Sequence, residues 1–171
     1  MGFISTNRHS RVALVVDTPN ITKSIINRHG PRVRPDYASL IRFAKSLGNV
    51  TAAVALVNDG VNPAFSNALT TLGFQVRLSH AFDCDDAVVA WAVRLHSNAE
   101  CIVICSGDHG YCPLVQLLKA IHRKIVLCAV SGSCNRRLRS LSDQYLEVPS
   151  YIPGVNRLPA RPREMAATET P

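Results

Sequence analysis

The fold is decided by one apolar run near the start of the chain, Arg11-Val12-Ala13-Leu14-Val15-Val16-Asp17. An unbroken apolar run of this length is typical of a strand that is covered on both faces, as in a parallel sheet. Because the run ends at Asp17, a carboxylate is expected at the carboxyl end of this strand. Both the type of sheet and the place of a polar residue on it follow from this stretch.

The rest of the chain alternates short β-rich runs with amphipathic segments. Further strands are expected at 50–57, 74–78, 101–105, 124–130 and 145–148. Helices are expected at about 36–47, 62–73, 86–96, 111–122 and 134–142. Such alternation predicts right-handed crossovers between parallel strands. We therefore expect an α/β fold, a single three-layer domain with a parallel sheet in the order 3-2-1-4-5 that is flanked by helices.

Three regions of the chain are expected. An N-terminal extension covers 1–10, the α/β domain covers 11–148, and a flexible tail covers 149–171. Five of the ten prolines fall in that last region, which favours an extended or disordered segment over packed structure.

Acidic residues follow three of the expected strands. Asp17 ends the first strand, and Ser106-Gly107-Asp108 follows the fourth. In the order 3-2-1-4-5 these two strands are neighbours, so both aspartates would lie at the switch point where such sheets bind ligands. Asp85 and Asp86 open a helix after the third strand, where an aspartate also commonly serves only as a cap.

Three acid-bearing loops at one edge of a sheet predict a metal site. Mg²⁺ and Mn²⁺ prefer hard oxygen ligands and usually keep several waters, so two or three carboxylates suffice. The predicted ligands, and catalytic residues, are Asp17, Asp86 and Asp108, with Asp85 as a substitute for Asp86. Ser106 either binds Asp17 or completes a tight turn, Tyr111 either stacks on a base or packs, and His109 is a weaker candidate for a base.

Basic charge points to a polyanionic partner. The net charge is +7, and the isoelectric point is about 9.4. Two acid-free stretches, 18–35 and 109–142, hold much of this charge. The predicted contacts to a nucleic-acid backbone, which the family resemblance given below implies to be RNA, are Lys23, Arg28, Arg32, Arg34, Arg136 and Arg137. The alternative is an ordinary solvated surface on a basic protein.

The cysteines and the apolar runs bear on the compartment. Six cysteines are present without a CxxC pair, which favours reduced thiols over a zinc site or a disulfide scaffold. The longest apolar runs are strand-sized, so no membrane span is expected. A cytoplasmic location is expected, and a homodimer is left open.

Three motifs resemble those of the NYN domain, a branch of the PIN-like nuclease superfamily. They are Val15-Val16-Asp17-Thr18-Pro19-Asn20, Asp85-Asp86 before an apolar helix, and Val103-Ile104-Cys105-Ser106-Gly107-Asp108-His109-Gly110-Tyr111-Cys112-Pro113-Leu114-Val115. The third is the most specific, because members typically show S-G-D-x-D-[FY]-x-P-L-V there. The likeness spans roughly 10–148.

The resemblance implies an acidic site for Mg²⁺ or Mn²⁺ and hydrolysis of phosphodiester bonds in single-stranded RNA. Asp17 matches the first acid and Asn20 the asparagine of the first motif. Asp86 or Asp85 matches the middle acid, and Ser106 and Asp108 match the third motif.

Two departures from the family pattern define an alternative. Gly110 stands where members carry a second acid, and Trp91 and Ala92 stand where a further acid is often found. The alternative is a NYN-type RNA-binding module with weak or no catalysis. A receiver-like phosphotransfer domain ranks behind both, since Val130-Ser131-Gly132 stands where that class carries a lysine.

Overall fold

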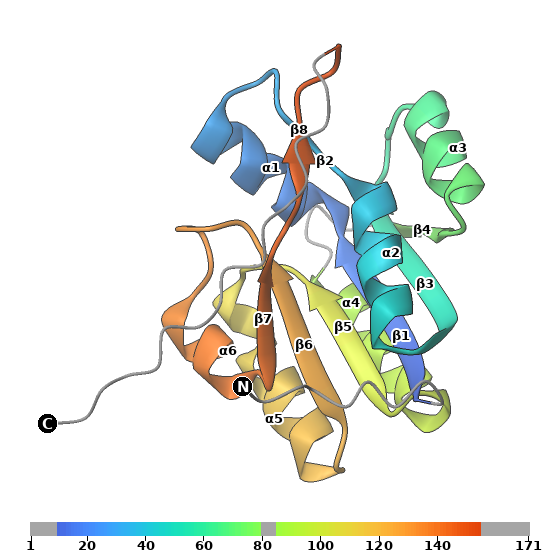
Figure 1. The fold of residues 1–171 in the computed structure, drawn as a ribbon, viewed down its shortest axis with the longest axis vertical. Helices are drawn as coiled ribbons and strands as arrows, with labels where there is room; N and C mark the ends of the chain where they lie inside the picture. Colours follow the sequence, from blue (N-terminus) through green and yellow to red (C-terminus); the bar gives the residue numbers. More distant parts are fainter. Residues whose placement is uncertain (1–9, 80–84, 155–171) are drawn as a thin grey trace, which may run out of the picture.

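A six-stranded parallel sheet forms the centre of the molecule. The computed structural model describes residues 10–79 and 85–154. The strands lie in the order β4-β3-β1-β5-β6-β7, and each neighbouring pair is parallel (Figure 1). Their bounds are β1 Arg11–Asp17, β3 Asn49–Asn58, β4 Gln75–Ser79, β5 Cys101–Cys105, β6 Lys124–Ala129 and β7 Gln144–Glu147.

This arrangement confirms the predicted fold class and extends the predicted strand order. The five strands expected in the order 3-2-1-4-5 correspond to β4, β3, β1, β5 and β6. The last expected strand, β7, pairs with β6 and adds a sixth strand at that edge. Because all six are parallel, their carboxyl ends share one edge of the sheet, which is the edge where sheets of this kind bind ligands.

Helices connect the strands. They are α1 Thr18–His29, α2 Tyr37–Leu47, α3 Pro63–Thr71, α4 Asp85–Leu95, α5 Cys112–Ala120 and α6 Arg136–Leu141, with short 3-10 turns η1 His96–Asn98 and η2 His109–Tyr111. Helix α1 is not among the expected helices. It begins immediately after β1 because Asp17 caps it, with Oδ1 accepting the Asn20 N–H at 3.0 Å, and because Ile21 and Ile25 are buried on one side.

A two-stranded antiparallel sheet lies outside the central one. It pairs β2 (Arg34–Pro35) with β8 (Ser150–Tyr151). The segment expected to be a flexible tail from 149 therefore begins with an ordered strand, which is a correction to that expectation. The rest of the expected tail from 155 onward, and the expected extension up to 9, lie outside the described residues.

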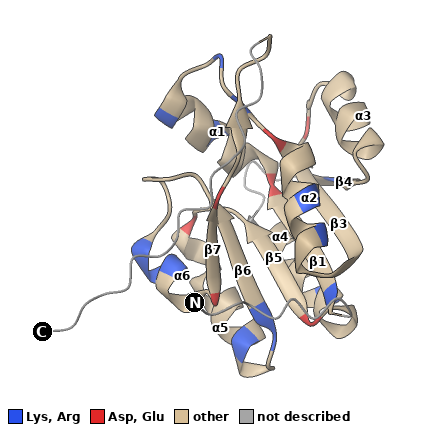
Figure 2. Cartoon of the chain, viewed as in Figure 1, with Lys and Arg blue, Asp and Glu red and all other residues tan. Residues whose placement is uncertain are grey.

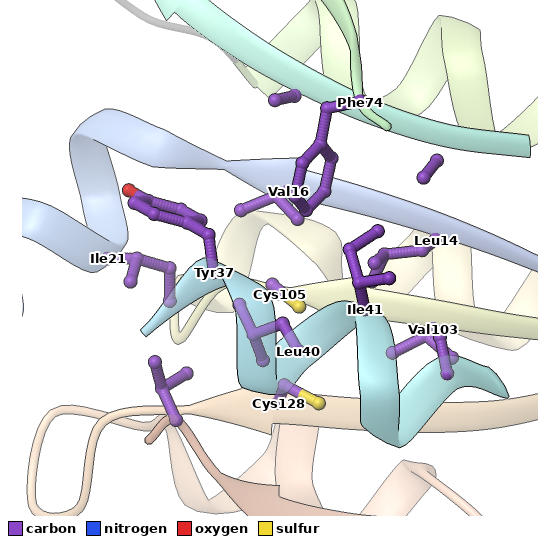
Figure 3. Packing of buried hydrophobic residues seen from close by; sticks show 14 of the residues in the cluster. Leu14, Val16, Ile21, Tyr37, Leu40, Ile41, Phe74, Val103, Cys105 and Cys128 are labelled. Atoms are coloured by element: carbon purple, nitrogen blue, oxygen red, sulfur yellow. The ribbon is translucent and has the colours of Figure 1, made fainter. Parts of the chain in front are cut away.

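The core consists of two layers, one on each face of the sheet. Side chains of β1 alternate between them, as the period of a strand requires. Leu14 and Val16 pack with Tyr37 and Leu40 on one face (Figure 3). On the other face, Ala13 and Val15 pack with a cluster that includes Val115 of α5. The sheet is thus covered on both faces, which explains the unbroken apolar run in β1.

Candidate functional site

The carboxylate of Asp17 is the centre of the candidate site. Its residue is only 3% exposed, at the carboxyl end of β1. Oδ2 accepts hydrogen bonds from the Ser106 hydroxyl at 3.3 Å and from the Tyr111 hydroxyl at 3.0 Å. With the Asn20 N–H on Oδ1, at least three donors from the described residues hold this buried carboxylate in one orientation.

Ser106 connects the two predicted aspartates. Its Oγ donates to Asp17 and accepts the N–H of Asp108 at 3.3 Å. The Oδ1 atom of Asn20 accepts the N–H of Gly107 at 3.2 Å, which ties the first turn of α1 to the loop after β5. The structure therefore joins Asp17, Asn20, Ser106 and Asp108 in one network, across the neighbouring strands β1 and β5. Of the alternatives left open for Ser106, the structure shows the hydrogen bond to Asp17.

Asp108 lies between this network and solvent. Its side chain is 38% exposed. Oδ1 accepts the Gly110 N–H at 2.8 Å and lies 3.3 Å from Nδ1 of the exposed His109. Among the described residues, no hydrogen bond reaches the other carboxylate oxygen of Asp108. One side of this carboxylate is thus held by the turn, while the other is available to a ligand.

A cavity of about 310 Å³, here called the polar pocket, opens beside Asp108. It is lined by Asn20, 107–109 and 132–135. Gly107 allows the loop at 132–135 to approach, since a Cβ there would lie 2.9 Å from the Ser133 carbonyl oxygen. A Cβ on Gly132 would lie 3.6 Å from Nη1 of Arg28, so a guanidinium from α1 lies at the rim. Carboxylate, amide and guanidinium groups therefore border one small cavity.

The predicted middle acid is placed differently from the other two. Asp86 is exposed in the first turn of α4, a helix that packs against β1 and contacts η2. The side chain of Asp85 lies outside the described residues, as does Asp83. Within the part of the chain that is described, no three Asp, Glu, His or Cys residues group closely enough to hold an ion.

The donors that do come together fit a hard divalent cation in kind. Asp17 and Asp108 supply carboxylate oxygens, and Asn20 and Ser106 supply amide and hydroxyl oxygens at the same place. Magnesium is commonly held by one or two carboxylates while it keeps several waters, so these donors are of the type that it prefers. Burial raises the pKa of the Cys134 thiol at the polar pocket, which disfavours a thiolate ligand for a softer metal.

The predicted RNA-binding residues come from α1, the segment after it and α6, and of the six Arg28 lies against Gly132 of the polar pocket. Lys23 and Arg28 are on α1, Arg32 and Arg34 follow it, and Arg136 and Arg137 open α6; all six are exposed. The N-cap of α6, Asn135, itself lines the pocket. Figure 2 shows Lys and Arg on α2 and α5 as well, so basic charge is not confined to this edge.

Tyr111 is the functional side chain that sequence reasoning did not assign. Its sequence position left stacking and packing open, and the structure shows it fully buried with its hydroxyl on Asp17. The two residues are 94 positions apart, so only the sheet order brings them together.

A parallel sheet whose adjoining strands β1 and β5 end in connected aspartates defines an α/β domain with an acidic site at its carboxyl edge. The model of the NYN domain family matches residues 11–149. The chain therefore belongs to the NYN domain family, which is part of the PIN-like superfamily.

Structural comparison agrees at the level of the fold. The chain is similar to a crystal structure of a protein of unknown function from Vibrio parahaemolyticus, with a TM-score of 0.76 and 19% identity. The match covers 86% of this chain and 96% of that one. No curated protein sequence matches the chain. No helix in the described ranges is long and apolar enough to cross a membrane.

Proposed function

We propose that this NYN domain is a divalent-metal-dependent ribonuclease that hydrolyses phosphodiester bonds of single-stranded RNA. The family has a nuclease-like fold, which supplies the reaction class. One observation carries the proposal: Asp17 and Asp108 end neighbouring strands and are connected through the Ser106 hydroxyl beside a polar pocket. Two acids brought together at a switch point need a ligand that compensates their charge, such as Mg²⁺ or Mn²⁺.

Each residue of the candidate site has a separate role in the proposed reaction. Asp17, held by three donors, is a fixed negative charge that does not reorient during the reaction. Asp108 offers its outer oxygen to the pocket, and Asp86 on α4 is proposed as the third acid. When bound, a divalent ion neutralises phosphate charge and lowers the pKa of a water. Arg28 at the rim is proposed to bind a neighbouring phosphate.

RNA in single-stranded form fits this arrangement. The polar pocket is small, at about 310 Å³; Arg28 lies at its rim, and α6 with Arg136 and Arg137 begins directly after the lining residue Asn135. A single strand can turn its backbone so that one phosphate enters such a pocket. The phosphates of a duplex are held on a stiff helix and cannot do so without an energetic cost.

A cleavage assay tests the proposal. A labelled single-stranded RNA is incubated with the full chain in Mg²⁺, in Mn²⁺ and in EDTA. Cleavage is expected with either metal and not in EDTA, and Asp108→Asn should reduce it by at least about a hundredfold. Glu100→Gln is the matched control, because it removes one carboxylate at the opposite end of β5, where Glu100 pairs with Arg11. Equal rates in Asp108→Asn and Glu100→Gln would overturn the proposal.

A specific observation favours a second candidate, an RNA-binding module with little or no catalysis. Gly110 supplies no carboxylate to the turn that holds Asp108. Tyr111 and Ser106 both donate to one oxygen of Asp17, which occupies acceptor sites that a metal would otherwise use. This candidate predicts RNA binding that is retained in Asp108→Asn, with no cleavage by the wild-type chain in any metal.

A cytoplasmic location is proposed on separate grounds. The five described cysteines are free thiols, and four of them are buried. Reduced cysteines in the core suit a reducing compartment.

A further inference from the structure

A second cavity lies on the other side of the first turn of α1. This cavity, here called the apolar pocket, has a volume of about 580 Å³. Thr18 and Pro19, the residues that follow Asp17, line it, whereas Asn20 lines the polar pocket. One helical turn therefore separates a mostly apolar cavity from the acidic site. Cavities of this size commonly hold small organic groups.

The walls of the apolar pocket are largely aromatic and aliphatic. Tyr37 and Phe65 are packed edge to face, with ring centroids 5.7 Å apart, and Tyr151 of β8 lies across from them along the lining. Leu69 and the partly exposed Leu72, at the carboxyl end of α3, also line the pocket. Burial raises the pKa of Tyr37, so its hydroxyl stays neutral beside Thr22 at 3.4 Å. Such walls suit a flat, uncharged ring.

The polar groups of the apolar pocket exclude one class of ligand. Asp36 and Asp59 line it, together with the amide side chain of Asn58. The guanidinium of Arg34 is directed to the carbonyl oxygens of Pro31 and Val33. Two carboxylates disfavour a phosphate, and that of Asp36 already accepts hydrogen bonds from the N–H and the hydroxyl of Ser39. The fit to a ligand therefore rests on the apolar walls.

We propose that the apolar pocket receives the base of a nucleotide that adjoins the phosphate bound at the polar pocket. The proposal rests on the proposed function in taking single-stranded RNA as the ligand and in placing one of its phosphates at the polar pocket. A ribonucleotide chain that crosses the first turn of α1 presents a phosphate to one cavity and a base to the other. The chemistry of each cavity matches the group that it receives, and the apolar pocket thereby anchors the strand next to the acidic site.

The test measures binding, without cleavage, in EDTA. The probes are a fluorescent oligoadenylate and a series of the same strand with a single abasic residue at each successive position. Loss of one stacked base should weaken binding on the order of tenfold at one position in the wild-type chain. Ala68→Trp fills the apolar pocket from the exposed face of α3, where Ala68 is a lining residue. Ala64→Trp is the matched control, because Ala64 is exposed on the same helix and does not line the pocket.

The variants separate the possible outcomes. Ala64→Trp should keep the position-dependent abasic profile, and Ala68→Trp should weaken binding of the intact strand and flatten the profile. Phe65→Leu keeps an apolar wall and should reduce the abasic effect without changing the melting temperature by more than a few degrees. Matching profiles in Ala68→Trp and Ala64→Trp would overturn the proposal, as would a flat profile in the wild-type chain.

Failure of the proposed function gives different results. If the abasic profile is as expected but no metal supports cleavage, the ribonuclease proposal fails and the base pocket stands. If the RNA is cleaved but every abasic strand binds equally, the base pocket fails and the ribonuclease stands. If neither the wild-type chain nor Ala64→Trp binds the strand and no metal supports cleavage, both fail.

Discussion

The hydroxyl of Tyr111 donates a hydrogen bond of 3.0 Å to Oδ2 of Asp17, and both residues are buried. This contact joins the turn after β5 to the end of β1. It also supplies a third donor to a carboxylate that is almost excluded from water. The same side chain therefore stabilises the fold and fixes the orientation of the central acid of the candidate site.

Removing this hydroxyl should destabilise the domain. Tyr111→Phe leaves a buried carboxylate with one donor fewer, and we expect a loss of about 2 kcal/mol in the free energy of unfolding. Tyr145→Phe is the control, since its hydroxyl donates to the neutral Ala129 carbonyl at 3.3 Å from a half-buried position. That change should cost about 1 kcal/mol or less. Urea denaturation of both variants would contradict the prediction if their midpoints coincided.

Restoring an acid at position 110 should strengthen metal binding. Gly110 is exposed, and its φ is not positive, so an aspartate fits the backbone without strain. Gly110→Asp is expected to lower the Mn²⁺ concentration that gives half-maximal cleavage by at least about tenfold. The neutral isostere Gly110→Asn should leave that concentration near the wild-type value. Identical Mn²⁺ dependence in the two variants would show that the added charge does not reach the metal.

We expect that position 107 requires glycine because a side chain there would collide with the neighbouring loop. A Cβ there would lie 2.9 Å from the backbone oxygen of Ser133, so Gly107→Ala must displace the loop that lines the polar pocket. We expect a cost of about 1–3 kcal/mol together with weaker RNA binding. Gly73→Ala tests backbone strain alone, because Gly73 has φ +97 and nothing within 4 Å of an added Cβ. It should cost about 1 kcal/mol and leave RNA affinity unchanged.

Arg28 is expected to contribute to phosphate binding from the rim of the polar pocket. Arg28→Ala should weaken binding of single-stranded RNA and reduce the slope of log affinity against log salt by about 0.7, the value for one phosphate contact. Lys45→Ala is the control. It removes an exposed positive charge from the last turn of α2 and should change the slope little. Fluorescence anisotropy titrations over a series of salt concentrations would count against Arg28 if both slopes fell equally.

Because of Asp143, the stability of the domain is expected to depend on pH in the acidic range. Burial alone would raise the pKa of Asp143, but the Ile125 N–H at 2.8 Å and the Lys119 ammonium at 2.8 Å outweigh it and lower that pKa below its ordinary 3.8. The stabilisation is therefore present above the ordinary pKa and is lost as the pH falls through the lowered one.

The variant Asp143→Asn should accordingly differ from the wild type at neutral pH and approach it in acid. Because the side chain is 35% exposed, the expected difference is below about 1 kcal/mol. Glu147→Gln is the control, since the carboxylate of Glu147 in β7 accepts no hydrogen bond from other described residues. Urea denaturation at several pH values would contradict the prediction if the Asp143→Asn difference grew on acidification.

Local sequence patterns were sufficient for the six strands of the central sheet and for the edge at which the site lies, but not for β2 and β8. Apolar runs such as 11–17 and 101–105 bury both faces of a strand; Asp17 ends the first, and Asp108 lies in the loop just after the second. Helix α1 was missed because its buried face rests on Ile21 and Ile25, too few positions to stand out from polar neighbours. The N-cap of this helix is Asp17, which the sequence pattern predicts as a metal ligand.

Tertiary structure decided the partners of the site residues. The bond from Tyr111 to Asp17, the approach of Arg28 to Gly132 and the exposed position of Asp86 depend on which strands are neighbours and how the helices pack on them. The cavities on either side of the first turn of α1 likewise arise from elements far apart in the chain. A strand or a cap is determined by interactions over a few residues, whereas these contacts join residues up to 94 positions apart and exist only once the sheet has assembled.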